Sequence, residues 1–159
     1  MGKKTKPDKR ALRDAKLAKA KLQVGALCYR WTNKGELRIL LITSRRTRRW
    51  IGPKGWPMRG KTHAESAATE ALEEAGVEGN TANKSIGFFN YQKNVGGRKT
   101  VRCTVQVFPM EVTKMHSNYK EKGQRKMRWL KPKKAAKRAD PLEFSKLIKK
   151  FAQKAEASA

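Results

Sequence analysis

Apolar and polar positions alternate along much of the chain, and this alternation predicts its strands. Between residues 22 and 29 every second position is apolar, a period of two that is typical of a β-strand. A short apolar run bounded by charges over 37–43 predicts a second, buried strand. Cys28 and Cys103 fall on apolar strand faces, where we expect buried thiols. Three further strands are predicted, with a hairpin turn at 95–98 between the first two: 85–91, 100–112 and 127–130.

Two helices have clear signals at their ends. Thr62 and Glu65 have the spacing of a capping box, in which each side chain accepts a hydrogen bond from the other residue's backbone amide. Gly76 is a preferred left-handed terminator, so this helix is predicted to end just before it. A second helix is predicted to begin with Asp140 as N-cap and Pro141 at its first position. Its apolar residues have a helical period: Phe144, Leu147, Ile148 and Phe151.

The order of strands, helix, strands and helix predicts an α/β fold in one domain, residues 22–156. The length of 159 residues is about one domain, and 38% hydrophobic residues suffice for one core. No stretch approaches 18 apolar residues and the N-terminus has no apolar signal core, which excludes a membrane-spanning helix and a secretory signal. Two cysteines exclude a disulfide scaffold and a four-thiolate zinc site. We therefore expect a soluble, cytoplasmic protein, with no prediction of its oligomeric state.

Charge changes this picture, because 39 Lys and Arg stand against 13 Asp and Glu, a net charge of +26. Such a chain attracts anions strongly. The first 21 residues hold nine basic side chains and no wide apolar face, which predicts a flexible basic arm, 1–21. This arm is either a solvated tail or a tether for RNA or other phosphates. A second basic run spans 124–138.

Acidic residues gather in one place, with five of the 13 between residues 50 and 79. Glu70, Glu73 and Glu74 have the spacing i, i+3 and i+4, which puts them on one helix face. Their mutual repulsion destabilises the helix unless a cation lies between them. Oxygen ligands without cysteine favour Mg²⁺ or Mn²⁺ over zinc. An ordinary acidic solvent face is the alternative, but a glycine-rich loop carrying Lys54 precedes this helix and suits a diphosphate.

Residues 55–77, GWPMRGKTHAESAATEALEEAGV, resemble the Nudix box, G-x5-E-x7-R-E-U-x-E-E-x-G-U, where U is a bulky aliphatic residue. The spacing is kept without insertion. The Pro-Lys-Gly-Trp entry is similar to the subgroup of diphosphoinositol polyphosphate and diadenosine polyphosphate phosphohydrolases. Three positions depart from the pattern: Lys61 replaces the first Glu, Thr69 replaces the Arg, and Ala71 replaces the aliphatic residue. In the family, that Arg mainly orients carboxylates.

The resemblance implies a three-layer α/β/α sandwich with a mixed sheet and a loop–helix–loop box. It also implies a pyrophosphohydrolase that uses Mg²⁺, with Mn²⁺ as a possible substitute. By position, the metal ligands are Glu70, Glu73, Glu74 and the backbone carbonyl of Gly55, with Glu74 as the base that accepts a proton from water. Basic residues near the box are candidates for holding the substrate's phosphates: Arg45, Arg46, Arg48 and Lys54.

Three functions remain open from the sequence. The first is hydrolysis of a polyphosphorylated small molecule, such as a dinucleoside polyphosphate, a diphosphoinositol polyphosphate or a nucleoside triphosphate. The second is removal of pyrophosphate from an RNA 5′ end, with the basic segments along the phosphate backbone. The third is a non-catalytic Nudix-fold module that binds nucleic acid, with Lys61 and Thr69 as marks of lost activity.

Overall fold

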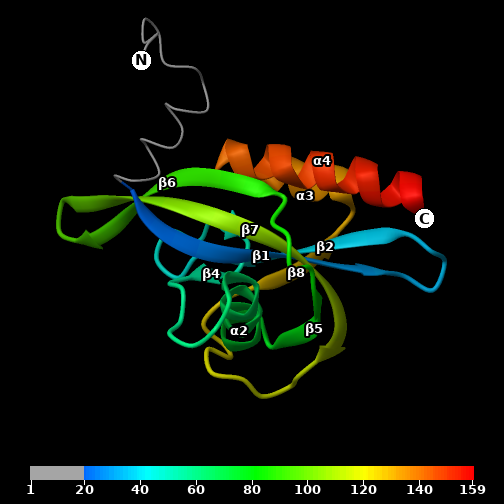
Figure 1. The fold of residues 1–159 in the computed structure, drawn as a ribbon, viewed down its shortest axis with the longest axis horizontal. Helices are drawn as coiled ribbons and strands as arrows, with labels where there is room; N and C mark the ends of the chain where they lie inside the picture. Colours follow the sequence, from blue (N-terminus) through cyan, green and yellow to red (C-terminus); the bar gives the residue numbers. More distant parts are fainter. Residues whose placement is uncertain (1–19) are drawn as a thin grey trace, which may run out of the picture.

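The structure is a computed structural model that describes residues 20–159. The predicted basic arm, 1–21, lies outside the described residues except for its last two positions. Figure 1 shows the elements in chain order: β1 (Lys21–Trp31), β2 (Leu37–Thr43), β3 (Trp50–Ile51), β4 (Lys54–Gly55), α2 (His63–Ala75), β5 (Val77–Thr81), β6 (Gly87–Gly96), β7 (Lys99–Met115), β8 (Met127–Leu130), α3 (Pro132–Arg138) and α4 (Leu142–Ser158).

The strands form one mixed eight-stranded sheet with the main order β3-β2-β1-β7-β5. β1 and β7 run parallel at its centre, and the other pairs are antiparallel. β6 pairs with the first half of β7, β8 pairs with β2, and β4 pairs with β1. β2 and β8 have the predicted bounds. β1 and β7 extend beyond the predicted runs at both ends, because pairing continues there. β6 begins at Gly87, two residues later than predicted, and continues to Gly96, beyond the predicted end.

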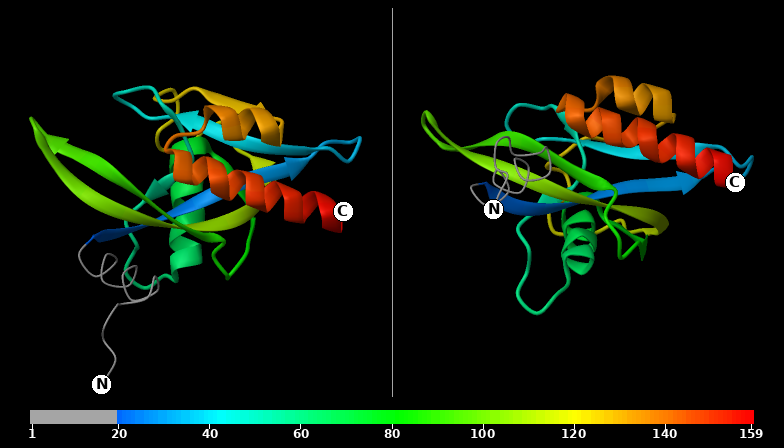
Figure 2. Two further views of the ribbon diagram at one scale, coloured as in Figure 1. Left: turned by 90° about the horizontal axis from the view of Figure 1, so that it is seen from above. Right: turned by 45° about the horizontal axis from the view of Figure 1, so that its top comes forward.

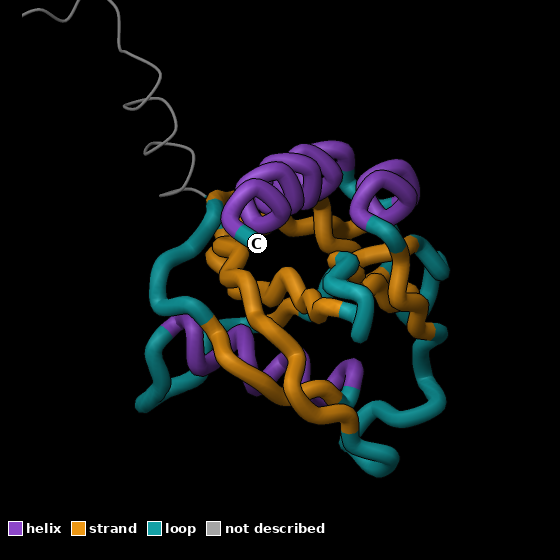
Figure 3. The backbone as a smooth tube through the Cα atoms, turned by 90° about the vertical axis from the view of Figure 1, so that its right-hand side faces the viewer, coloured by secondary structure: helices purple, strands orange, loops and turns teal. Residues whose placement is uncertain are grey.

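Helices cover both faces of the sheet, with α2 on one face and α3 and α4 side by side on the other (Figures 2 and 3). Small residues of α2, among them Ala67 and Ala71, pack on Val24 and Cys28 of β1. Larger residues of α4, Phe144 and Ile148 among them, pack on the opposite face. β1 is therefore buried on both sides, and the predicted α/β/α sandwich is confirmed. No helix in residues 20–159 is long and apolar enough to cross a bilayer.

Two elements of five or more residues, β5 and α3, escaped the sequence-based prediction, as did the two-residue strands β3 and β4. β5 has the sequence VEGNT and pairs with β7 through a bulge between Glu78 and Gly79. It has no apolar alternation of its own, so its pairing with β7 decides its conformation. α3 lies within the basic run 124–138, and its sequence, PKKAAKR, has only Ala135 and Ala136 buried. Two alanines are too few to give a helical period.

The predicted start of the last helix is wrong by one residue. Pro141 is the N-cap of α4, and no side chain caps it. Asp140 instead forms an ion pair with Arg49, with Oδ2 3.1 Å from Nη1. The tertiary contact with the 44–49 turn thus replaces the local cap. The glycine-rich loop that carries Lys54 contains the two-residue strands β3 and β4.

Candidate active site

Local capping contacts hold α2 in the predicted position. The Glu65 amide donates to Thr62 Oγ1 at 3.1 Å, and the Thr62 amide donates to Glu65 Oε1 at 2.8 Å. At the other end, Gly76 has a φ of 69°. The capping box and the left-handed terminator are both confirmed. They fix which residues of α2 face the sheet and which face the neighbouring loop.

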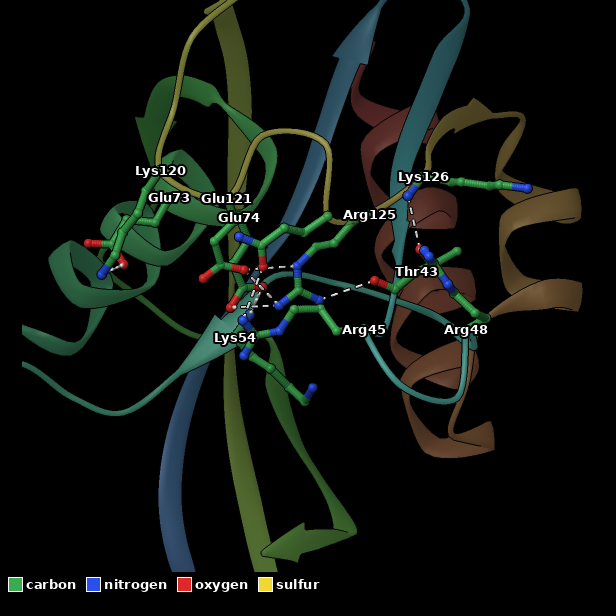
Figure 4. A network of polar contacts seen from close by, with 11 residues as sticks. Thr43, Arg45, Arg48, Lys54, Glu73, Glu74, Lys120, Glu121, Arg125 and Lys126 are labelled. Carbon is green, nitrogen blue, oxygen red and sulfur yellow. Dashed lines mark hydrogen bonds and ion pairs between the residues drawn. The ribbon is translucent and has the colours of Figure 1, made fainter. Parts of the chain in front are cut away.

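Glu74 is the most buried of the three helix carboxylates, and two elements hold its oxygens (Figure 4). The backbone amide of Lys54, on β4, donates to Oε1 at 3.3 Å. Arg125 Nη2 lies 3.8 Å from Oε2. Burial, reinforced by the charge of Glu70, raises the pKa of Glu74 to about 8, although Arg125 and Lys54 favour the ionised form. Glu74 is therefore poised between its two protonation states near neutral pH.

Glu70 and Glu73 flank this carboxylate. Pairing of β4 with β1 places Gly55 against Glu70, and a Cβ at residue 55 would collide with the Glu70 carboxyl group. Burial raises the pKa of Glu70, with smaller contributions from the charges of Glu73 and Glu121, opposed by a hydrogen bond with Glu74. Glu73 Oε1 lies 3.8 Å from Lys120 Nζ. A side chain at residue 55 would therefore force the Glu70 carboxyl group out of its present position.

The loop between β7 and β8 adds two site residues that the sequence analysis missed. The Glu121 amide donates to the Glu73 carbonyl at 2.9 Å, which ties this loop to α2. Arg125 is buried and donates to Glu121 Oε1 from Nε at 3.1 Å and from Nη2 at 3.0 Å. Its Nη1 donates to the Thr43 carbonyl at 3.1 Å. Glu121 is a fourth carboxylate at the site, and no spacing relates it to the box.

Among the basic candidates, Lys54 and Arg45 lie beside the carboxylates (Figure 4). Lys54 Nζ lies 4.8 Å from the centroid of the Tyr91 ring. The pKa of Lys54 is lowered to about 8, chiefly by burial and also by nearby cations such as Lys93, against the attraction of Glu74. Arg45 Nη1 donates to Gln124 Oε1 at 3.2 Å. The negative charge of an approaching phosphate would favour the protonated, charged form of Lys54.

The other two arginine candidates lie farther out on the same turn. Arg48 donates to Thr43 Oγ1 at 3.4 Å and points away from the carboxylates (Figure 4). Arg46 is exposed, and its side chain makes no hydrogen bond or ion pair with the described part of the chain. The structure thus brings Lys54 and Arg45 to the carboxylates, and leaves Arg46 and Arg48 on the surface of the turn.

Two of the three departures from the box, Lys61 and Thr69, contact each other. Lys61 Nζ donates to Thr69 Oγ1 at 2.8 Å, and Thr69 Oγ1 donates to the carbonyl of Glu65 at 3.0 Å. The box positions that carry Glu and Arg in the Nudix pattern are therefore neighbours in this chain. Neither side chain makes an ion pair with the carboxylates among the described residues. In this chain Arg125 supplies the guanidinium next to Glu74 instead.

The donor chemistry of this cluster fits a hard divalent cation. Four carboxylates surround the site, and the missing Cβ of Gly55 leaves the space that Glu70 fills. Across residues 20–159, no three His, Cys, Asp or Glu side chains converge closely enough to hold a metal ion as they stand. Arg125 and Lys120 supply positive charge to Glu74 and Glu73 in that arrangement. To bind an ion, the carboxylate side chains must therefore rotate about their own bonds, while the backbone of α2 stays in place.

Comparisons with known proteins give the family context. The family model of the NUDIX domain matches residues 21–151. Nudix hydrolase 12, mitochondrial, of Arabidopsis thaliana is 29% identical over 108 residues, 63% of this chain and 51% of that protein. The chain spans about half the length of the curated relatives it matches.

Solved structures share the fold. A binary complex of the C. elegans Ap4A hydrolase has a TM-score of 0.60 and 20% identity, over 87% of this chain and 99% of that one. The NUDIX domain of Shewanella oneidensis NrtR, complexed with ADP ribose, has a TM-score of 0.63 and 10% identity, over 85% and 88% of the two chains. At these identities the likeness extends to the fold alone.

Proposed function

Because this chain belongs to the Nudix family, we propose that it is a hydrolase that cleaves a phosphoanhydride bond of a polyphosphorylated small molecule with the help of a divalent cation. The observation that carries the proposal is the packing of Glu70 and Glu74 against β4, which carries Lys54, with Glu73 next to them on α2, in a chain that is otherwise strongly basic. Carboxylates bind the cation, and the basic surround binds the substrate's phosphates.

Under this proposal the metal ligands are Glu70, Glu73, Glu74 and the Gly55 carbonyl, and Glu121 is a further candidate. A bound Mg²⁺ or Mn²⁺ would neutralise phosphate charge and lower the pKa of a bound water. Glu74 is our choice for the group that accepts the proton of the attacking water. A raised pKa suits that role, because a general base works best when its pKa is near the working pH.

The basic residues divide by distance from the carboxylates. Lys54 and Arg45 are placed to hold the phosphates next to the reacting bond. Arg46 and Arg48, on the same turn, suit phosphates farther along the substrate. Dinucleoside polyphosphates, diphosphoinositol polyphosphates and nucleoside triphosphates all present such a row of phosphates.

A substrate panel with Mg²⁺ and with Mn²⁺ tests the proposal, with 5′-triphosphorylated RNA as a further substrate. We expect Glu73→Gln to lower turnover by more than the roughly 100-fold typical of residues that only support metal ligands. Glu36→Gln, in an exposed ion pair with Arg38, is the matched control and should leave turnover unchanged. Full turnover by the Glu73 variant would refute the ligand assignment. Calorimetry that detects no Mg²⁺ or Mn²⁺ binding to the wild type would favour a non-catalytic module.

A further inference from the structure

The outer side of α3 and the end of β8 carry a surface made only of cations. We define this cationic surface as six exposed residues: Arg128, Lys131, Lys133, Lys134, Lys137 and Arg138. The last five line a surface hollow of about 670 Å³, and among residues 20–159 no other residue lines it. Within this part of the chain the hollow therefore has no acidic and no aromatic lining residue.

These charges are uncompensated within the described chain. None of the six side chains makes an ion pair with residues 20–159, and the only hydrogen bond recorded for them there is from Arg128 to the neighbouring Met127 carbonyl at 3.0 Å. Lys133 and Lys137 are four residues apart on α3, a spacing at which like charges destabilise a helix. Lys133 and Lys134 also lie in the first turn, where the helix dipole disfavours positive charge.

The helix forms despite this repulsion because it is anchored from its other side. Ala135 and Ala136 are buried against the sheet and α4. The cations therefore project outward from a fixed base. These unpaired positive charges repel one another and destabilise the free protein. An anionic partner would neutralise them.

The cationic surface is separate from the proposed active site. α3 and α2 cover opposite faces of the sheet (Figures 2 and 3). On β8, Trp129 packs in the core on the α2 side and Leu130 in the core on the α3 side. Since strand side chains alternate between faces, Arg128 points to the α3 side with Leu130. The active-site carboxylates therefore do not face these cations.

We propose that this cationic surface binds the phosphate backbone of single-stranded RNA without regard to sequence. Lysine ammonium groups contact phosphates as point charges, and none of the described lining residues has an aromatic ring to stack on a base. Among the described residues that line the hollow there is also no apolar side chain to anchor a membrane-bound helix or a peptide side chain. The surface also has no buried donor of the kind that fixes a compact small molecule.

The shape of the surface favours a single strand over a duplex. The chain turns from a strand to a helix between Leu130 and Pro132, so the six cations lie on two elements of different direction. A flexible single-stranded RNA can lie along both elements. A duplex, which is stiff over roughly 150 base pairs, can follow only one without a cost in bending.

The test is fluorescence anisotropy of a labelled 20-nucleotide oligouridine with the full chain. The variant K133E/K134E/K137E reverses three charges of the surface. The control K84E/K150E/K154E makes the same change in net charge at lysines that line a different hollow, of about 290 Å³, next to Leu147 and Phe151. We expect the α3 variant to bind at least about tenfold more weakly near 0.1 M salt, with a salt slope flatter by about 2 because three phosphate contacts are lost. The control should change affinity by less than about threefold, because these screened charges lie outside the contact surface.

Further arms separate a backbone site from general charge effects and from other partners. Oligothymidine of the same length should bind like oligouridine, and a DNA duplex, polyglutamate and anionic vesicles should bind more weakly. Equal losses in the two triple variants, or stronger binding of any of those three competitors, would overturn the proposal, as would a wild type that does not bind. If the charge reversal prevents folding, K133Q/K134Q/K137Q replaces it in the comparison with the wild type and the control. Thermal unfolding then checks that this variant is folded.

This inference does not depend on the proposed hydrolase activity. Glu73→Gln should bind oligouridine like the wild type, and K133E/K134E/K137E should hydrolyse the small-molecule substrate like the wild type. Loss of hydrolysis in the α3 variant, with its fold intact, would contradict the separation of the two sites. Cross-linking of bound oligouridine followed by mass spectrometry should modify residues 128–138.

Discussion

Arg125 is the residue that connects the candidate site to the rest of the molecule. Its guanidinium joins the end of β2, through the Thr43 carbonyl, to Glu121 and to Glu74. The box itself lacks its arginine, since Thr69 takes that place and bonds to Lys61. The guanidinium next to Glu74 thus comes from a distant loop and not from the box.

Replacing Arg125 by Met should lower the free energy of unfolding by roughly 3 kcal/mol, because it leaves the Glu121 carboxylate without its buried counter-ion and removes the cation next to Glu74. Urea unfolding of the metal-free protein measures this. Arg38→Met, at an exposed pair with Glu36, is the control and should cost at most about 1 kcal/mol. Equal losses at the two arginines would show that Arg125 is an ordinary surface partner.

The raised pKa of Glu74 predicts how stability depends on pH. The folded state holds this proton up to about pH 8, whereas the unfolded chain releases it near 4.5. The folded state therefore binds more protons between these values, and stability from this group is full below pH 4.5 and is lost as the pH rises toward 8. The lowered pKa of Lys54 has the opposite sign and acts only above pH 8.

Thermal unfolding of chelator-treated protein between pH 5 and pH 8 measures that dependence. The Glu74→Gln variant should have a flatter profile than the wild type, because its side chain does not titrate. Added Mg²⁺ should stabilise the wild type more at pH 8 than at pH 5.5, since the metal binds the ionised carboxylate. Identical profiles for wild type and variant would contradict the shifted pKa of Glu74.

At the scale of elements, the C-terminus of α2 holds the loop that supplies Glu121 and Arg125. The Gly76 carbonyl accepts a hydrogen bond from the His116 amide at 2.7 Å. A Cβ at residue 76 would collide with the ring of Tyr119, which lies on the same loop. The end of the helix and the position of the loop are therefore set by the same glycine.

Gly76→Ala should destabilise the protein by more than Gly60→Ala. Both glycines have positive φ, 69° and 79°, so both variants lose about 1–2 kcal/mol from backbone strain. Only residue 76 adds a collision, because a Cβ at residue 60 meets nothing within 4 Å. Chemical denaturation compares the two variants, and equal losses would mean that the Tyr119 ring moves aside freely.

At the scale of the whole molecule, one sheet separates the candidate active site from the cationic surface, although neighbouring segments of the chain contribute to both. Arg125 contacts the carboxylates on the α2 side, and the cations from Arg128 onward lie on the α3 side. The four residues of β8 carry the chain from one to the other. The cations of the whole chain repel one another, because its net charge is +26.

This repulsion predicts that sodium chloride stabilises the metal-free protein. Raising the salt concentration from about 0.02 M to about 0.3 M shortens the range of electrostatic interactions from more than 20 Å to less than 10 Å. The melting temperature should rise by about 2–4 °C for each kcal/mol of repulsion removed. The variant K133E/K134E/K137E should gain less from salt than the wild type does. A melting temperature that falls with salt in the wild type would show that attractive ion pairs outweigh the repulsion.

The sequence by itself determined what depends on neighbours along the chain. The capping box at Thr62, the terminator at Gly76 and the bounds of β2 and β8 are local features, and the structure has all of them. The family likewise follows from spacing within 55–77, and the family model confirms it. In each case the determining contacts lie within a few residues or within one helix.

Only the tertiary structure decided what depends on distant partners. β5 is a strand because β7 pairs with it. Asp140 forms an ion pair with Arg49 and does not cap the last helix. Glu121 and Arg125 join the site because their loop is tied to α2, although almost fifty residues separate them from the box carboxylates. Contacts of this kind leave no periodic pattern in the sequence, since each requires only one suitable side chain at each end and a fold that brings the two together.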